Sequence, residues 1–301
     1  MGSVPNPAVS DASSLLPRTW VAPDASFSLL ARWHLLSLDA PTVATVWMWF
    51  VARCFSFALS GYELAGMFLA VWILYATDRL LDSRTAGHPV PDLKPRHHFH
   101  AVHRKAFLVG LGGTFAGLFL CVAHFPLHEL ALEIRLGGLL AAWFLLIHSV
   151  GRLHRLRLPK EIAVGVFFAA AVFLPAAAHR PQSAASMIPP ALLFAGLCSA
   201  NGLFIHVWES DRAPDTTAST SQIVIWLVHR IQPLALLGCA TAAVLALVLP
   251  GPDAPLDVAV AVSLLLLLLL HSTRSRLQAT HLRALADLVL LSPLLVAVLL
   301  A

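Results

Sequence analysis

The sequence predicts an all-α, polytopic membrane protein with about nine transmembrane helices. Hydrophobic residues make up 58% of the 301 residues and charged residues only 12%, whereas soluble domains contain about 45–50% apolar and about 25% charged residues. Several apolar segments also reach the roughly 20 residues that a helix needs to cross a bilayer core of about 30 Å. These observations exclude an ordinary soluble enzyme. The net charge of +4 is therefore interpreted through its distribution along the chain rather than as a sign of nucleic-acid binding.

The expected spans lie in one domain, residues 25–301, behind a cytosolic tail. The tail, residues 1–24, is rich in Pro, Ser and Ala and lacks the apolar core of a signal peptide. Residues 25–38 alternate apolar residues with Arg32 and His34, which predicts an amphipathic helix in the membrane surface. The expected spans are 40–58, 62–80, 105–124, 130–149, 161–178, 187–207, 222–249, 256–271 and 284–301.

Two of these spans have an unusual length. Pro252 and Pro255 shorten the eighth span. The 222–249 segment is long enough to begin as an interfacial turn, with His229 and Arg230 near the lipid headgroups.

The basic residues predict the orientation of the chain. All but three of the 20 Lys and Arg residues fall on one side of the expected spans, and the exceptions are Arg53, Arg135 and Arg180. Because basic loops stay in the cytosol, we expect a cytosolic N-terminus. Nine spans then place the C-terminus outside, in a membrane that we expect to be a bacterial inner membrane.

A histidine-rich segment, residues 96–105, contains His97, His98, His100 and His103. Imidazoles are common transition-metal ligands, but neighbouring basic residues oppose a cation. The four cysteines are isolated in or beside apolar runs and form no CxxC site. A solvated basic surface for phosphate or anionic lipid is the favoured interpretation.

Acidic residues gather where the second and sixth spans reach the cytosolic side. Asp78 and Asp82 are four residues apart and share one helix face, a spacing that can hold a divalent cation. Ion pairs with neighbouring arginines are the alternative. Glu209 and Asp211 can converge only if the sixth helix ends there, and an ordinary ion pair between Glu209 and Arg212 is an equal alternative. Ionisable groups at membrane depth are costly, so this convergence is a functional hypothesis.

These acidic segments resemble the two Asp-rich motifs of the UbiA superfamily of intramembrane prenyltransferases. That family has nine spans and carries the motifs at the cytosolic ends of the second and sixth helices. Its first motif, often NDxxDRxxD, aligns without gaps with Leu-Tyr-Ala-Thr-Asp-Arg-Leu-Leu-Asp at 74–82, where Leu74 and Tyr75 replace the Asn and the first Asp. The second motif commonly ends in DxEGDR and resembles Glu-Ser-Asp-Arg at 209–212, without the leading carboxylate.

A third likeness follows the fourth span. The family has Tyr-xxx-Lys there, followed by Leu-Pro and a Gly, and this chain has His148-xxx-Arg152, Leu158-Pro159-Lys160 and Gly165. With the span count, the resemblance extends over nearly the whole chain and implies a UbiA-like helical bundle.

The resemblance implies a prenyltransferase that moves a prenyl group from an isoprenoid diphosphate to a lipophilic acceptor. Mg²⁺ and basic side chains would stabilise the charge of the departing diphosphate in a dry cavity. The implied catalytic residues and metal ligands are Asp78, Asp82, Glu209 and Asp211. The implied diphosphate contacts are Arg79, Lys94, Arg96, Arg152, Lys160 and Arg212, although the cytosolic bias of basic residues alone explains each of them. The implied acceptor side comprises Tyr75, His148, Asn201 and His206.

Two other functions stay open. Leu74 and Tyr75 at two motif positions are compatible with a catalytically inactive UbiA fold, acting as a lipid- or quinone-binding protein or as a subunit of a membrane complex. His148, His206 and His271 lie at similar expected depths, which admits redox-metal or haem binding.

Overall fold

Every regular element in the described part of the chain is a helix. The computed structural model describes residues 28–85, 99–100, 102–125, 160–211 and 222–299, together with isolated positions between 130 and 142. The expected tail, residues 1–24, and most of the expected span 130–149 lie outside these ranges. Both therefore stay predictions.

The chain is a multi-pass membrane protein by the length and apolarity of its helices. Seven described stretches are long and apolar enough to cross a membrane, and an eighth span results if the bent pair α1–α2 is counted as one. Nine spans were expected from the sequence, and the described residues contain seven or eight candidate spans. The seven stretches comprise α3 (Gly61–Thr85), α5 (Arg104–Val122), α7 (Lys160–His179), α8 (Ala184–Ser210), α10 (Ile231–Val248), α11 (Ala254–Thr273) and the consecutive helices α12 (Ala279–Val289) and α13 (Ser292–Leu299).

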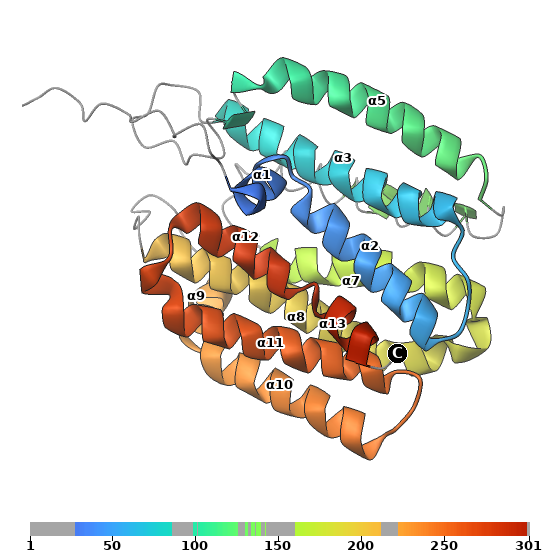
Figure 1. Ribbon diagram of the computed structural model, residues 1–301, viewed down its shortest axis with the longest axis vertical. Helices are drawn as coiled ribbons and strands as arrows, with labels where there is room; N and C mark the ends of the chain where they lie inside the picture. Colours follow the sequence, from blue (N-terminus) through green and yellow to red (C-terminus); the bar gives the residue numbers. More distant parts are fainter. Residues whose placement is uncertain are drawn as a thin grey trace, which may run out of the picture.

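The long helices lie side by side with similar directions (Figure 1). The closest pairs are α7 with α8, α10 with α11, and α3 with α5, while α2 (Asp39–Cys54) packs against α3 and α7. On α5 and α10, large apolar side chains such as Phe119 and Leu247 are exposed, as expected for surfaces that face lipid rather than water. These two helices therefore give the bundle an apolar outer surface.

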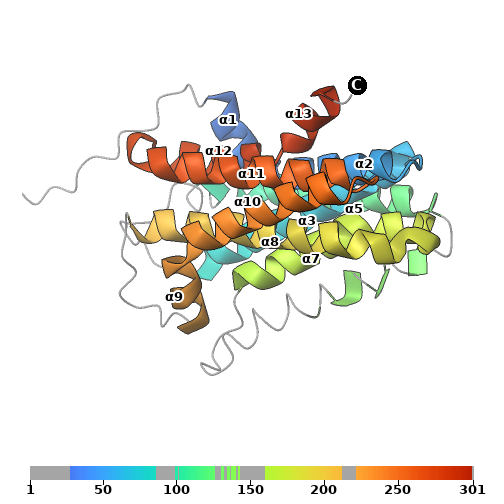
Figure 2. The same ribbon diagram turned by 90° about the horizontal axis from the view of Figure 1, so that it is seen from below.

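Two of the expected spans are broken in the structure. The 222–249 segment divides at Arg230 into α9 (Gln222–His229) and α10, and Figure 2 shows α9 projecting away from the bundle. The last span divides between α12 and α13. In contrast, α11 is longer than the expected 256–271, because Pro255 lies in its first turn, where a missing N–H group breaks no helical hydrogen bond.

A sharp corner precedes α2. Helix α1 (Leu29–Leu35) meets α2 at 92°, and Ser37 at the corner has a φ of 60°. The interfacial helix expected for residues 25–38 stays a prediction. Of its two polar residues, Arg32 is exposed, whereas His34 is only 2% exposed and faces the bundle. The corner turns this histidine inward.

Aromatic side chains of α2 and α8 pack against each other in the core. The rings of Trp47 and Phe194 lie 4.3 Å apart, and both side chains are fully buried. The indole N–H of Trp47 donates to the carbonyl oxygen of Leu290 at 2.7 Å. Since Leu290 lies at the break between α12 and α13, this bond satisfies a carbonyl that the broken helix leaves free.

Candidate functional site

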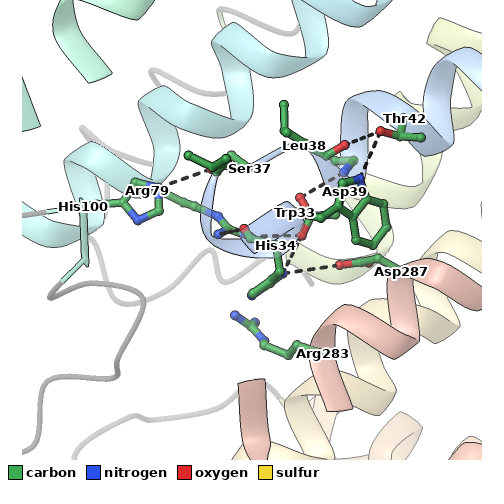
Figure 3. A network of polar contacts seen from close by, with 12 residues as sticks. Trp33, His34, Ser37, Leu38, Asp39, Thr42, Arg79, His100, Arg283 and Asp287 are labelled. Carbon is green, nitrogen blue, oxygen red and sulfur yellow. Dashed lines mark hydrogen bonds and ion pairs between the residues drawn. The ribbon is translucent and has the colours of Figure 1, made fainter. Parts of the chain in front are cut away.

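A group of buried polar side chains lies at one end of the bundle. We call this end the polar end. Helices α3, α8 and α11 end there, and α2 and α12 begin there. The group, named the buried cluster below, draws its members from the α1–α2 corner and from three further helices (Figure 3). Its members are His34, Asp39, Arg79, Asn201 and Asp287.

Asp39 is at the centre of the buried cluster. Its side chain is fully buried, and its Oδ2 lies 2.5 Å from Nδ1 of His34. Its Oδ1 accepts the backbone N–H of Ala40 at 3.0 Å. Asp39 begins α2, where the N-terminal end of the helix dipole favours a negative charge. The His34–Asp39 contact spans the corner and so fixes the angle between α1 and α2.

Arg79 compensates the charge of Asp39. Its Nη2 donates to Asp39 Oδ2 at 3.4 Å and its Nη1 to the carbonyl oxygen of His34 at 2.9 Å. The guanidinium also lies over the ring of Tyr75, 4.4 Å from the ring centre, one helical turn earlier on α3. Arg79 is 5% exposed, so its positive charge interacts with groups inside the protein rather than with solvent.

Asp287 completes the buried cluster from α12. Its Oδ1 accepts from the side-chain amide of Asn201 at 3.0 Å, and its Oδ2 lies 3.9 Å from His34 Nδ1, beyond hydrogen-bond distance. In Figure 3 the side chains of Asp287 and Arg283 both extend from α12 toward His34. Helices α2, α3, α8 and α12 thus meet at one polar site.

The formal charges of the buried cluster show what it requires. Two carboxylates and one guanidinium leave one negative charge when His34 is neutral. An uncompensated charge in a dry bundle costs several kcal/mol. The cluster therefore favours one further positive charge, either a proton or a cation.

Two more ion pairs involve the acidic residues of the expected second motif. Arg283 Nε lies 2.8 Å from Glu209 Oε1, within ion-pair range but without the alignment of a hydrogen bond. Arg274 Nε donates to Asp211 Oδ2 at 3.3 Å. A pocket of about 410 Å³ opens beside the second pair, and its lining residues are Trp208, Asp211, Arg274, Ser275 and Leu282.

The structure brings only some of the expected site residues together. Tyr75 and Arg79 join the α1–α2 corner, and Asn201 joins Asp287. Asp78 is half-buried on α3 and Lys160 is exposed at the start of α7. The side chain of Asp82 lies outside the described residues, as do Lys94, Arg96, His148, Arg152 and Arg212.

The histidine hypotheses are also resolved in part. His271 accepts a hydrogen bond from the indole N–H of Trp208 at 2.9 Å, whereas His206 is oriented toward Glu161 of α7, 3.8 Å away. These two histidines therefore have different partners.

The histidine-rich segment departs from a fully solvated surface. His100 is fully buried, with its Nε2 3.3 Å from the hydroxyl of Ser37, whereas His103 is exposed. His97 and His98 lie outside the described residues.

The sequence pattern placed Asp287 among the polar residues at the cytosolic helix ends without giving it a role, and it did not indicate His34 or Asp39 as site residues. Within the part of the chain that the structure describes, these three form the one group whose ligand-type atoms lie close enough to hold a metal ion, all within 4.8 Å of one another. Fold and site together define a multi-pass helical membrane protein with a buried ionic cluster at one end. Comparison with protein-family models, curated proteins and solved structures finds no match.

Proposed function

We propose that the chain is a UbiA-like intramembrane protein, with nine spans and a cytosolic N-terminus, that binds an isoprenoid or quinone-type lipid without transferring a prenyl group. The supporting observation is that three charged residues of the expected motifs have a partner of opposite charge in the same chain. Arg79 pairs with Asp39, Glu209 with Arg283, and Asp211 with Arg274.

Such pairing weakens the metal-diphosphate chemistry. Mg²⁺ binds through carboxylate oxygens and phosphate oxygens. Glu209 and Asp211 are each paired with a guanidinium, at 2.8 Å and 3.3 Å, so neither pair has a net negative charge to attract a second cation. Leu74 and Tyr75 also remove an amide and a carboxylate from the first motif. Arg79, with its charge already compensated, has little left to offer a diphosphate.

An apolar pocket supports lipid binding. It has a volume of about 430 Å³ and lies between α11 and α13, at the end of the bundle opposite the polar end. Its lining includes Pro255, Val258, Val262, Leu295 and Leu299. This apolar lining suits a branched hydrocarbon chain, since the named side chains offer no hydrogen-bond partner.

A second candidate function is Mg²⁺-dependent prenyl transfer, favoured by the pocket beside Asp211. The side chains of Asp211 and Arg274 are 52% and 38% exposed, and exposed ion pairs contribute only about 0–1 kcal/mol. A magnesium diphosphate could therefore displace this pair. Asp78 and Asp82 would then share the metal with the acidic residues of α8.

One experiment distinguishes the two functions. The full-length protein is purified in mild detergent, its bound lipids are identified by mass spectrometry, and diphosphate release from farnesyl or geranylgeranyl diphosphate is measured with Mg²⁺ and a membrane-lipid extract as acceptor. We expect a stoichiometric isoprenoid lipid and no Mg²⁺-dependent release. Release that is lost in Asp78→Ala and Asp211→Asn would establish transfer instead, and the absence of both lipid and release would exclude both functions.

A further inference from the structure

We propose that His34, Asp39, Asp287 and Asn201 form a binding site for a divalent transition-metal ion of the zinc or manganese type. The site belongs to the buried cluster and uses none of the acidic residues of the expected Asp-rich motifs. It is also independent of the proposed lipid binding, because no residue of the apolar pocket takes part.

The donor set determines the class of metal. His34 offers an imidazole nitrogen, and Asp39 and Asp287 each offer a carboxylate oxygen. Imidazole combined with carboxylates suits zinc, manganese and iron, whereas magnesium and calcium prefer all-oxygen sites. The absence of sulfur among these donors argues against a soft ion such as copper(I).

The spacing of the donors fits one ion after a small movement. Ligands bonded to one ion at about 2.1 Å lie about 3.0–3.4 Å apart. Nδ1 of His34 is 2.5 Å from Asp39 Oδ2 and 3.9 Å from Asp287 Oδ2, so the observed distances bracket that range. An ion would replace the proton shared by His34 and Asp39 and would draw the carboxylate of Asp287 inward.

Asn201 provides a separate indication that a ligand belongs here. It is 8% exposed, its Nδ2 donates to Asp287, and its Oδ1 is buried without a hydrogen-bond partner among the described residues. Buried polar atoms without partners are rare. A proton on His34 would leave this oxygen unsatisfied. Rotation of the amide by 180° would exchange Oδ1 with Nδ2, which lies 3.0 Å from Asp287 Oδ1, and would so turn the oxygen toward an ion bound by Asp287.

Charge and orientation are compatible with a metal. Arg79 donates to Asp39 Oδ2 and the N–H of Ala40 donates to Asp39 Oδ1, as outer partners commonly do for ligating carboxylates. Because Asp287 adds a second carboxylate, the buried cluster stays net negative in spite of Arg79. A divalent ion with neutral His34 gives the buried cluster one net positive charge. We therefore expect the oxygen of a hydroxide ion to complete the coordination.

The test uses the full-length protein in detergent, stripped with EDTA and titrated with Zn²⁺ alone against a chromophoric chelator. Wild type should bind one equivalent, and Asp287→Asn and His34→Gln should bind at least tenfold more weakly. Because the chain has 15 histidines, stoichiometry alone does not locate the ion. The matched control is Asp257→Asn, which changes another buried aspartate with an unpartnered oxygen, on α11, and should bind like wild type.

A spectroscopic measurement on wild type covers the case in which the variants do not fold. Mn²⁺ bound to the EDTA-stripped protein should give electron spin-echo modulation from a single imidazole nitrogen. Wild type that binds no Zn²⁺, Asp287→Asn that binds it as tightly as wild type, or bound Mn²⁺ without imidazole modulation would each overturn the proposal.

Discussion

Arg79 donates to Asp39 Oδ2 across 3.4 Å, and this contact connects the end of α3 to the start of α2. The same guanidinium also binds the carbonyl oxygen of His34. One side chain thus contacts both helices of the α1–α2 corner, where two further members of the buried cluster, His34 and Asp39, are located.

Replacing Arg79 by Met should destabilise the protein strongly. Breaking one partner of a buried ion pair leaves an uncompensated charge, at a cost of about 3–5 kcal/mol. The variant should unfold at a markedly lower temperature or denaturant concentration in detergent, followed by tryptophan fluorescence. The double variant Arg79→Met with Asp39→Leu should recover much of the loss, because the buried cluster then has the same net charge as in the wild type, one negative charge, now on Asp287.

Arg32→Met is the control for this comparison. Arg32 lies on the exposed face of α1, so its replacement should change stability by less than about 0.5 kcal/mol. Equal losses for Arg32→Met and Arg79→Met would contradict the role assigned to the buried contact.

A second prediction concerns the close packing of α7 on α8 at Gly165. A Cβ atom there would lie 2.2 Å from Ser199 Oγ and 2.6 Å from the backbone oxygen of Ala195. Gly165→Ala should therefore cost about 1–3 kcal/mol through overpacking, measured by the same unfolding assay. Gly196→Ala on α8 is the matched control, since nothing lies within 4 Å of its added Cβ. A neutral Gly165→Ala would show that the two helices are less tightly packed than described.

The sequence predicted the helical class and most helix positions because apolar length and polar breaks are local properties. It also indicated the possible break at Arg230. The corner between α1 and α2 was not predictable, because it depends on the backbone of Ser37 and on contacts from α3. Without that corner, His34 belongs to a surface helix, which is where the amphipathic pattern placed it.

The candidate site was predicted less well, for a related reason. Tyr75, Arg79 and Asn201 were expected site residues, but the resemblance assigned Arg79 to a diphosphate. Its observed partner, Asp39, lies 40 positions away. Asp287 contacts Asn201 from 86 positions away. A pattern in one segment gives no sign of such contacts, so an intramolecular partner and a ligand could not be distinguished.

A third prediction concerns Trp47→Phe. The substitution keeps an aromatic ring against Phe194 but removes the indole N–H that binds the Leu290 carbonyl oxygen. We expect a loss of about 1–3 kcal/mol, because a buried carbonyl loses its partner, and increased hydrogen exchange around the α12–α13 break. Trp49→Phe is the control, since Trp49 is only half-buried and stacks with Arg53. Similar effects of both substitutions would argue against a specific role for the Trp47 hydrogen bond.

The last prediction tests the orientation inferred from the basic residues. Gln182 and Gln278 are both exposed and lie at opposite ends of the bundle, Gln182 before α8 and Gln278 before α12. The orientation expected from the basic residues places the polar end in the cytosol. It predicts that a membrane-impermeant maleimide applied to intact cells labels Gln182→Cys and spares Gln278→Cys. Both should be labelled once the cells are permeabilised. The wild type, with its four cysteines, sets the background. Labelling of Gln278→Cys alone in intact cells would reverse the inferred orientation, and labelling of both would contradict a membrane-spanning arrangement of α8 and α12.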